Sequence, residues 1–127
     1  MREEKQLRII LNIIGEYKLN EPLHRFLKNY YREHPNMGSK DRALASSFVF
    51  NYFRLGMAWK EGGPEERLTL GNFLCWDQPS PLLHYILEKC SDFRDEDLAL
   101  SLQEKFMLAE KKYPDFRHQD ILSFSDR

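Results

Sequence analysis

The sequence has 127 residues, of which 42% are hydrophobic and 13% aromatic, so it has the size and composition of one globular domain with its own core. Its longest apolar runs stay far below the roughly 20 residues that span a bilayer, and its charged N-terminus is unlike a secretory signal. We therefore expect no membrane partner and a cytoplasmic location. The formal net charge of −1 identifies no ligand by itself.

The first two predicted helices cover residues 2–18 and 22–33. In both segments apolar residues recur with the spacing of one helical face: Leu7, Ile10, Leu11 and Ile14 in the first, and Leu23, Phe26, Leu27, Tyr30 and Tyr31 in the second. The second helix follows the N-cap candidate Asn20, begins at Pro22 and ends before Pro35.

The third predicted helix runs from Lys40 to Leu55, with Ser39 placed to cap it. Its apolar residues form a band that is too wide for a surface helix, so we expect this helix to be covered on more than one side. Phe48, together with Val49 or Tyr52, is predicted to be deeply buried.

Three further helices are predicted in the second half of the chain. They cover residues 65–76, a segment that begins at Pro81 with Ser80 as its cap, and residues 95–112. No run of alternating polar and apolar residues indicates a strand. The sequence therefore predicts an all-α, single-domain bundle of about six helices at residues 1–112. Residues 113–127 are predicted to form a linker or the lead-in to another domain.

The patterns that carry common catalytic chemistry are missing from the sequence. There is no glycine-rich phosphate loop, and the four histidines do not have the spacing of metal ligands. Cys75 and Cys90 stand fifteen residues apart without a CxxC motif, which favours two reduced, half-buried thiols. We therefore expect no catalytic residue, no cofactor and no metal in this chain by itself.

The sharpest feature is a row of cations on the second predicted helix. Arg25, Lys28 and Arg32 are spaced i, i+3 and i+7, so they form one basic ridge opposite the apolar face. Residues 1–60 contain eleven Lys and Arg against six Asp and Glu, whereas residues 61–127 contain eight against fourteen. A ridge of this kind can grip phosphates, but a solvated helix face is the alternative that the spacing leaves open.

Other residues around the ridge extend the hypothesis. Lys40, Arg42 and Arg54 are further candidate RNA contacts, although Arg54, at the negative end of its helix, is expected to act mainly in stability. For the pair Tyr30-Tyr31, the commoner arrangement is that both rings belong to the core. The alternative is one buried ring and one exposed ring that stacks on an unpaired base.

Residues 23–56 also carry a family resemblance. They comprise an amphipathic helix, a short loop, Asp41-Arg42, and a helix with Ser47-Phe-Val-Phe-Asn-Tyr52 that closes on Arg54. This pattern resembles the NusB-like N-terminal domain of the Sun (Fmu) family of RNA cytosine-5 methyltransferases. It covers about a quarter of the chain and is moderately specific.

The resemblance implies a NusB-like helical domain that recognises RNA, ribosomal RNA in particular, and takes part in rRNA processing. In that family a Rossmann-type domain follows, which binds S-adenosylmethionine and uses two cysteines. Neither the cofactor loop nor the cysteine motifs of that domain are found here, so no catalytic role transfers to Cys75 or Cys90. The resemblance therefore implies that S-adenosylmethionine and a C-terminal catalytic domain belong to a parent enzyme. The rival hypothesis is a NusB-type module that binds other proteins.

Overall fold

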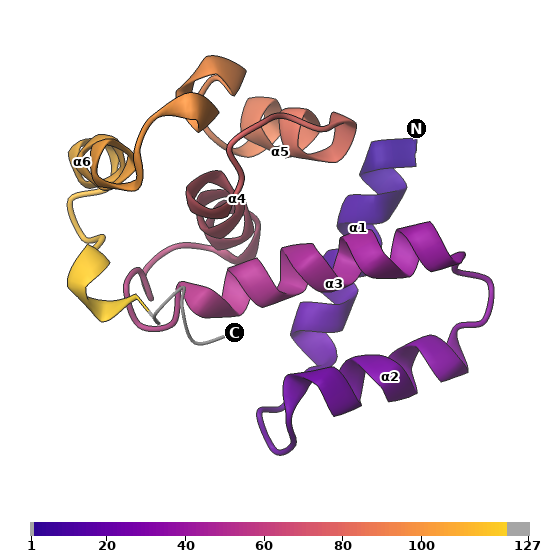
Figure 1. Cartoon of the computed structure of the whole chain (residues 1–127). Helices are drawn as coiled ribbons and strands as arrows, with labels where there is room; N and C mark the ends of the chain where they lie inside the picture. Colours follow the sequence, from indigo (N-terminus) through magenta and orange to yellow (C-terminus); the bar gives the residue numbers. More distant parts are fainter. Residues whose placement is uncertain (1, 122–127) are drawn as a thin grey trace. The chain divides into compact units, whose positions relative to one another are not determined.

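The computed structural model describes residues 2–121, which contain six α-helices, two short 3₁₀ helices and no strand (Figure 1). The predicted all-α class with about six helices is therefore confirmed. The elements, in chain order, are α1 (Arg2–Glu16), α2 (Leu23–Glu33), α3 (Ser39–Arg54), α4 (Pro64–Cys75), α5 (Pro81–Cys90), η1 (Asp95–Ala99), α6 (Leu102–Lys112) and η2 (His118–Asp120).

The helices divide into two compact units, the first ending at Val49 and the second beginning at Phe50, so that the division falls inside α3. In the N-terminal unit, α2 and the first part of α3 form a hairpin, and α1 crosses it (Figure 1). The side-chain amide of Asn12 on α1 donates to the Tyr30 hydroxyl at 2.9 Å, and Arg2 pairs with Asp41 at 3.7 Å. These contacts tie α1 to both helices of the hairpin.

The hairpin itself is held by Tyr31. Its hydroxyl donates to the Arg42 carbonyl at 3.2 Å and lies 2.8 Å from the Ser46 hydroxyl. Burial raises the pKa of Tyr31 above its ordinary value, so the phenol stays protonated and able to donate at neutral pH.

The third helix is the buried helix that the sequence predicts. Phe48, Val49 and Tyr52 are all buried, which confirms the predicted core positions. α3 begins at Ser39 and not at Lys40, because the first intrahelical bond joins the Arg42 amide to the Gly38 carbonyl. Gly38 therefore precedes the helix, where Ser39 was expected.

In the C-terminal unit α4 packs against α5 and α6. Every residue of α4 from Leu68 to Leu74 is buried, which a helix achieves only when it is covered all round. Inside it, Asn72 accepts a hydrogen bond from the buried Asn51 side chain at 2.9 Å, which connects α4 to the last turn of α3.

The ends of α4 and α5 are fixed by specific polar contacts. Lys105 on α6 is only 4% exposed, and its ammonium donates to the Trp76 carbonyl at the end of α4 at 2.7 Å. The hydroxyl of Ser80 accepts from the Leu83 amide, which confirms the predicted cap of α5. On α5, the exposed His84 lies 2.7 Å from Asp95 and 2.6 Å from Glu88.

The single helix predicted for residues 95–112 is wrong, because the segment divides into η1 and α6. Ser101 and Glu104 form a capping box: the Ser101 hydroxyl accepts from the Glu104 amide, and the Glu104 carboxylate accepts from the Ser101 amide. This Ser-x-x-Glu pair starts a new helix, since it satisfies backbone amides that a continuous helix would have bonded internally.

Residues 113–121, which begin the predicted linker, lie against the C-terminal unit. Phe116 is buried, and the Arg117 amide donates to the Ala58 carbonyl at 2.7 Å. The rest of that predicted segment, 122–127, lies outside the described residues.

Cys75 and Cys90 are free, half-buried thiols, as the sequence indicated. Within residues 2–121, every helix is too short or too polar to cross a bilayer.

Candidate nucleic-acid interface on the N-terminal unit

The basic ridge of α2 faces away from the core. With 100° per residue, Arg25, Lys28 and Arg32 fall within an arc of about 60°, roughly opposite the buried Leu27 and Tyr30. All three cations are exposed. The structure therefore arranges the three residues as the sequence predicted, on the solvent side of one amphipathic helix.

The ridge cations are also not neutralised by neighbouring acids. Among the residues that the structure describes, none of Arg25, Lys28 and Arg32 forms an ion pair, whereas Arg2 pairs with Asp41 and Arg8 pairs with Glu4. Three unpaired cations on one helix face give a local positive potential that would attract a polyanion.

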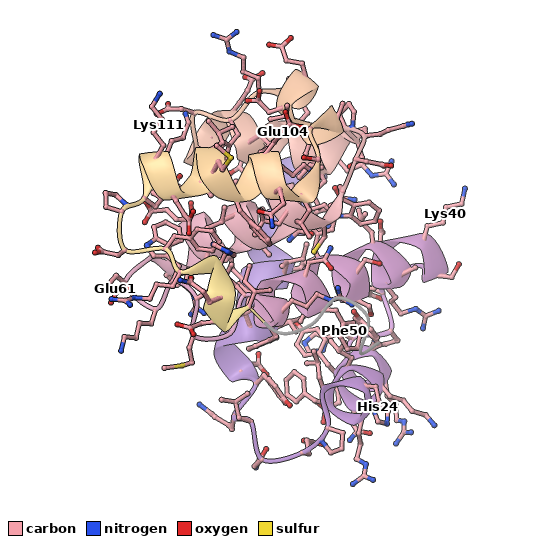
Figure 2. All side chains as sticks on the ribbon, turned by 60° about the vertical axis from the view of Figure 1, so that its left-hand side comes forward. His24, Lys40, Phe50, Glu61, Glu104 and Lys111 are labelled. Atoms are coloured by element: carbon pink, nitrogen blue, oxygen red, sulfur yellow. The ribbon has the colours of Figure 1, made fainter. Side chains whose placement is uncertain are left out.

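Lys40 and Arg42 extend this basic surface from the start of α3. Both are exposed, and Figure 2 shows Lys40 reaching outward from the first turn. Arg42 adjoins α2, because its carbonyl accepts the hydrogen bond from Tyr31. Five of the predicted contact residues thus belong to one compact unit.

Arg54 does not belong to the same unit as the other five. It lies half-buried in the last turn of α3, in the unit that begins at Phe50. Its position at the carboxyl end of the helix fits the stability role expected for it.

The two adjacent tyrosines fall between the two expectations, because one ring is in the core and the other is neither buried nor exposed. Tyr30 is buried and Tyr31 is half-buried, with their rings nearly perpendicular at a centroid distance of 6.0 Å. The Tyr31 hydroxyl bonds across the hairpin to α3, so Tyr31 links the helices that carry Arg32 and Arg42.

The N-terminal unit also contains a cavity of about 480 Å³ that the sequence did not predict. Its walls come from the start of α1, the end of α2, the loop that follows α2 and the start of α3. The lining is mixed, and besides Pro35 and the two rings of Tyr30 and His34 it comprises aliphatic and polar residues. The apolar residues are Ile9, Ile10, Met37, Leu44 and Ala45, and the polar side chains are those of Arg2, Lys5, Gln6, Glu33, Asn36 and Asp41.

One wall of this cavity is an aromatic pair. The His34 ring lies on the Tyr30 ring with centroids 4.0 Å apart and planes inclined by 15°. A 2.8 Å hydrogen bond between the His34 Nδ1 atom and the Tyr30 carbonyl holds the imidazole in place. Tyr30 is buried beneath it, whereas His34 is exposed.

Sequence patterns gave no indication of this cavity, because its lining residues come from positions 2 to 45 without a shared motif or spacing. The local signal that could have suggested it is the Pro35–Gly38 loop, since a connection rich in helix breakers often borders a site. In residues 2–121 no cluster of three His, Cys, Asp or Glu side chains has the arrangement of a metal site. The chain matches no protein-family model, no curated protein and no solved structure.

Proposed function

We propose that this chain is an RNA-binding domain, and that the ridge of Arg25, Lys28 and Arg32, with Lys40 and Arg42 beside it, contacts the phosphate backbone. The single observation that carries the proposal is the exposure, on one face of α2, of three cations that form no ion pair with any acid in residues 2–121. Contacts with phosphates position a nucleic acid without reading its sequence, so this surface by itself gives weak and poorly sequence-specific binding.

Counterion release supplies a direct test. Each phosphate that a protein cation neutralises releases condensed counterions, so the logarithm of affinity falls with the logarithm of salt concentration by ~0.7 per contact for a single strand and ~0.9 for a duplex. Changing Arg25, Lys28 and Arg32 together to Ala should reduce this slope by about two to three units if all three touch phosphate. Alanine is the best helix former, so α2 should remain intact.

The matched control changes Lys60, Lys89 and Lys111 to Ala. These three lysines are also exposed, but they belong to the C-terminal unit. Fluorescence anisotropy with a labelled oligoribonucleotide, measured across a salt series, should show an unchanged slope for the control. Equal losses in both triple variants, or an unchanged slope in the ridge variant, would contradict the proposal and favour the protein-binding alternative.

We further propose that the parent protein is an S-adenosylmethionine-dependent RNA cytosine-5 methyltransferase that acts on ribosomal RNA, with this chain as its non-catalytic recognition domain. The support for this step is the resemblance of residues 23–56 alone. The gene sequence downstream of the Arg127 codon tests it. A Rossmann-type domain with a proline-cysteine and a threonine-cysteine motif is expected there, and an unrelated sequence would refute the family assignment while leaving the ridge proposal intact.

A further inference from the structure

We propose that the cavity between the ends of α1, α2 and α3 holds one unpaired nucleobase that carries an exocyclic amino group. This inference rests on the proposed RNA-binding function and adds a site at which a base is read. It concerns adenine, cytosine and guanine as a class, in preference to uracil.

The size and walls of the cavity fit a flat aromatic ring. Its volume of about 480 Å³ falls in the range of ligand pockets, which runs from about 300 to 1,000 Å³. The imidazole of His34 is fixed against Tyr30 on one side, so its other face offers a preordered platform. Proteins that read single-stranded RNA stack splayed-out bases on aromatic side chains in this way.

The polar groups of the cavity select the edge of that base. Asp41 and Glu33 are carboxylates, which only accept hydrogen bonds when ionised, and both line the cavity. An exocyclic amino group offers two N–H donors to such acceptors, whereas the pairing edge of uracil offers only its N3–H, flanked by the lone pairs of O2 and O4 that would face the carboxylates. Gln6 can both donate and accept, so it suits the ring nitrogens of any base.

The charges around the cavity connect it with the ridge. Lys5 lines it and can meet the phosphate of the inserted nucleotide, and Arg2, which also lines it, can do so if it leaves its 3.7 Å ion pair with Asp41. Arg32 immediately precedes Glu33, so the ridge ends where the cavity begins. The three ridge residues extend over about 10 Å of helix. Tyr30 and His34, which line the cavity, lie on roughly the opposite side of the α2 axis from the ridge, so a strand bound to the ridge has to pass round the carboxyl end of α2 to place a base in the cavity.

The experiment compares labelled oligouridylates with the same oligonucleotides carrying one central adenosine or cytidine. We expect the amino-bearing base to raise affinity about tenfold, which is the discrimination given by one well-placed hydrogen-bonding contact. The variant with Asp41→Asn and Glu33→Gln should lower this ratio to about one, because an amide can donate to O4 of uracil as well as accept from an amino group.

The matched control is the double variant Glu4→Gln with Glu16→Gln. It makes the same charge change on α1, and like Asp41 with Arg2, Glu4 forms an exposed ion pair with an arginine. Its affinity ratio should stay near tenfold. A second variant, Leu44→Trp, adds a large ring at a residue that lines the cavity, and it should abolish the preference while leaving the salt slope of the ridge unchanged. A circular dichroism melt of each variant verifies that it is folded.

The outcomes separate this inference from the proposed function. If the ridge triple variant flattens the salt slope but the unchanged protein binds all oligonucleotides equally, the cavity assignment is wrong and the RNA-binding function stands. If no oligonucleotide binds, the proposed function is wrong. The cavity is then tested separately, by calorimetric measurement of the binding of adenosine and uridine monophosphates. Binding of the adenosine nucleotide that is lost in the Asp41 and Glu33 double variant would support the site for free nucleotides, and no binding would overturn it.

Discussion

Replacing Gly71 of α4 by Ala tests how closely α4 approaches the last turn of α3. A Cβ atom at Gly71 would lie 2.5 Å from the Asn51 carbonyl oxygen and 3.2 Å from the carbonyl carbon, whereas ordinary contacts begin at 3.4 Å. The atoms in the way belong to the backbone of a helix, so they cannot move aside as a side chain can. The helices must separate by nearly an ångström, and this separation would also stretch the buried hydrogen bond from Asn51 to Asn72.

The size of the effect follows from two opposing contributions. Overpacking of a close-packed interior costs typically ~1–3 kcal/mol, and the loss of part of the amide hydrogen bond adds about 1 kcal/mol. Alanine, on the other hand, is favoured over glycine inside a helix by about 1 kcal/mol. We expect a net loss of ~2 kcal/mol in the free energy of unfolding, which corresponds to roughly 8 °C in Tm for a domain of this size.

The matched control is Gly15→Ala in α1, where a Cβ atom would meet nothing within 4 Å. There the same substitution should leave stability unchanged or raise it by up to ~1 kcal/mol. Urea unfolding followed by circular dichroism measures both variants. If Gly71→Ala proves as stable as Gly15→Ala, the close approach of α4 to α3 is wrong.

Two further predictions concern the C-terminal unit. Lys105→Met keeps most of the side-chain packing but removes the donor to the Trp76 carbonyl, so it should lower the free energy of unfolding by ~1–3 kcal/mol, whereas the exposed Lys111→Met should have almost no effect. The hydrogen bond and charge of Asp95, followed by those of Glu88, raise the pKa of His84 above its ordinary value of about 6.5. The imidazolium contacts therefore stabilise the fold fully below that ordinary value, and this stabilisation is lost as pH rises through the folded-state pKa. Melting temperatures of the unchanged protein and of His84→Gln should differ most at pH 5.5 and converge at pH 8.5; a constant difference would refute the assignment.

The accuracy with which the sequence predicts helix bounds differs from one segment to another. The helix at residues 23–33 was predictable to within one residue, because apolar and charged side chains alternate with a period of 3.6 and prolines bracket it. The division of residues 95–112 was missed although Ser101 and Glu104 stand at capping-box spacing. The apolar periodicity suggested one continuous helix there, and the local hydrogen bonds of the cap prevailed over it.

In the candidate site, too, some features follow from residue spacing within one helix, and others depend on contacts between helices. The spacing of Arg25, Lys28 and Arg32 placed them on one face, since helical geometry alone relates residues three and seven positions apart. Which of Tyr30 and Tyr31 is buried could not be read from adjacent, identical residues. Tertiary contacts decided it: Tyr30 meets Asn12 of α1 and the ring of His34, whereas the hydroxyl of Tyr31 meets Arg42 and Ser46 of α3.

The sequence by itself therefore determined the helical class, the positions of most helices and the basic face of α2, because each depends on periodicity or on caps within a few residues. Two features were settled only by tertiary packing: the close contact at Gly71 and the cavity that Asp41 and His34 line. These features depend on where helices cross. Crossings are set by the packing of side chains that are distant in sequence, and no local pattern records which of them meet.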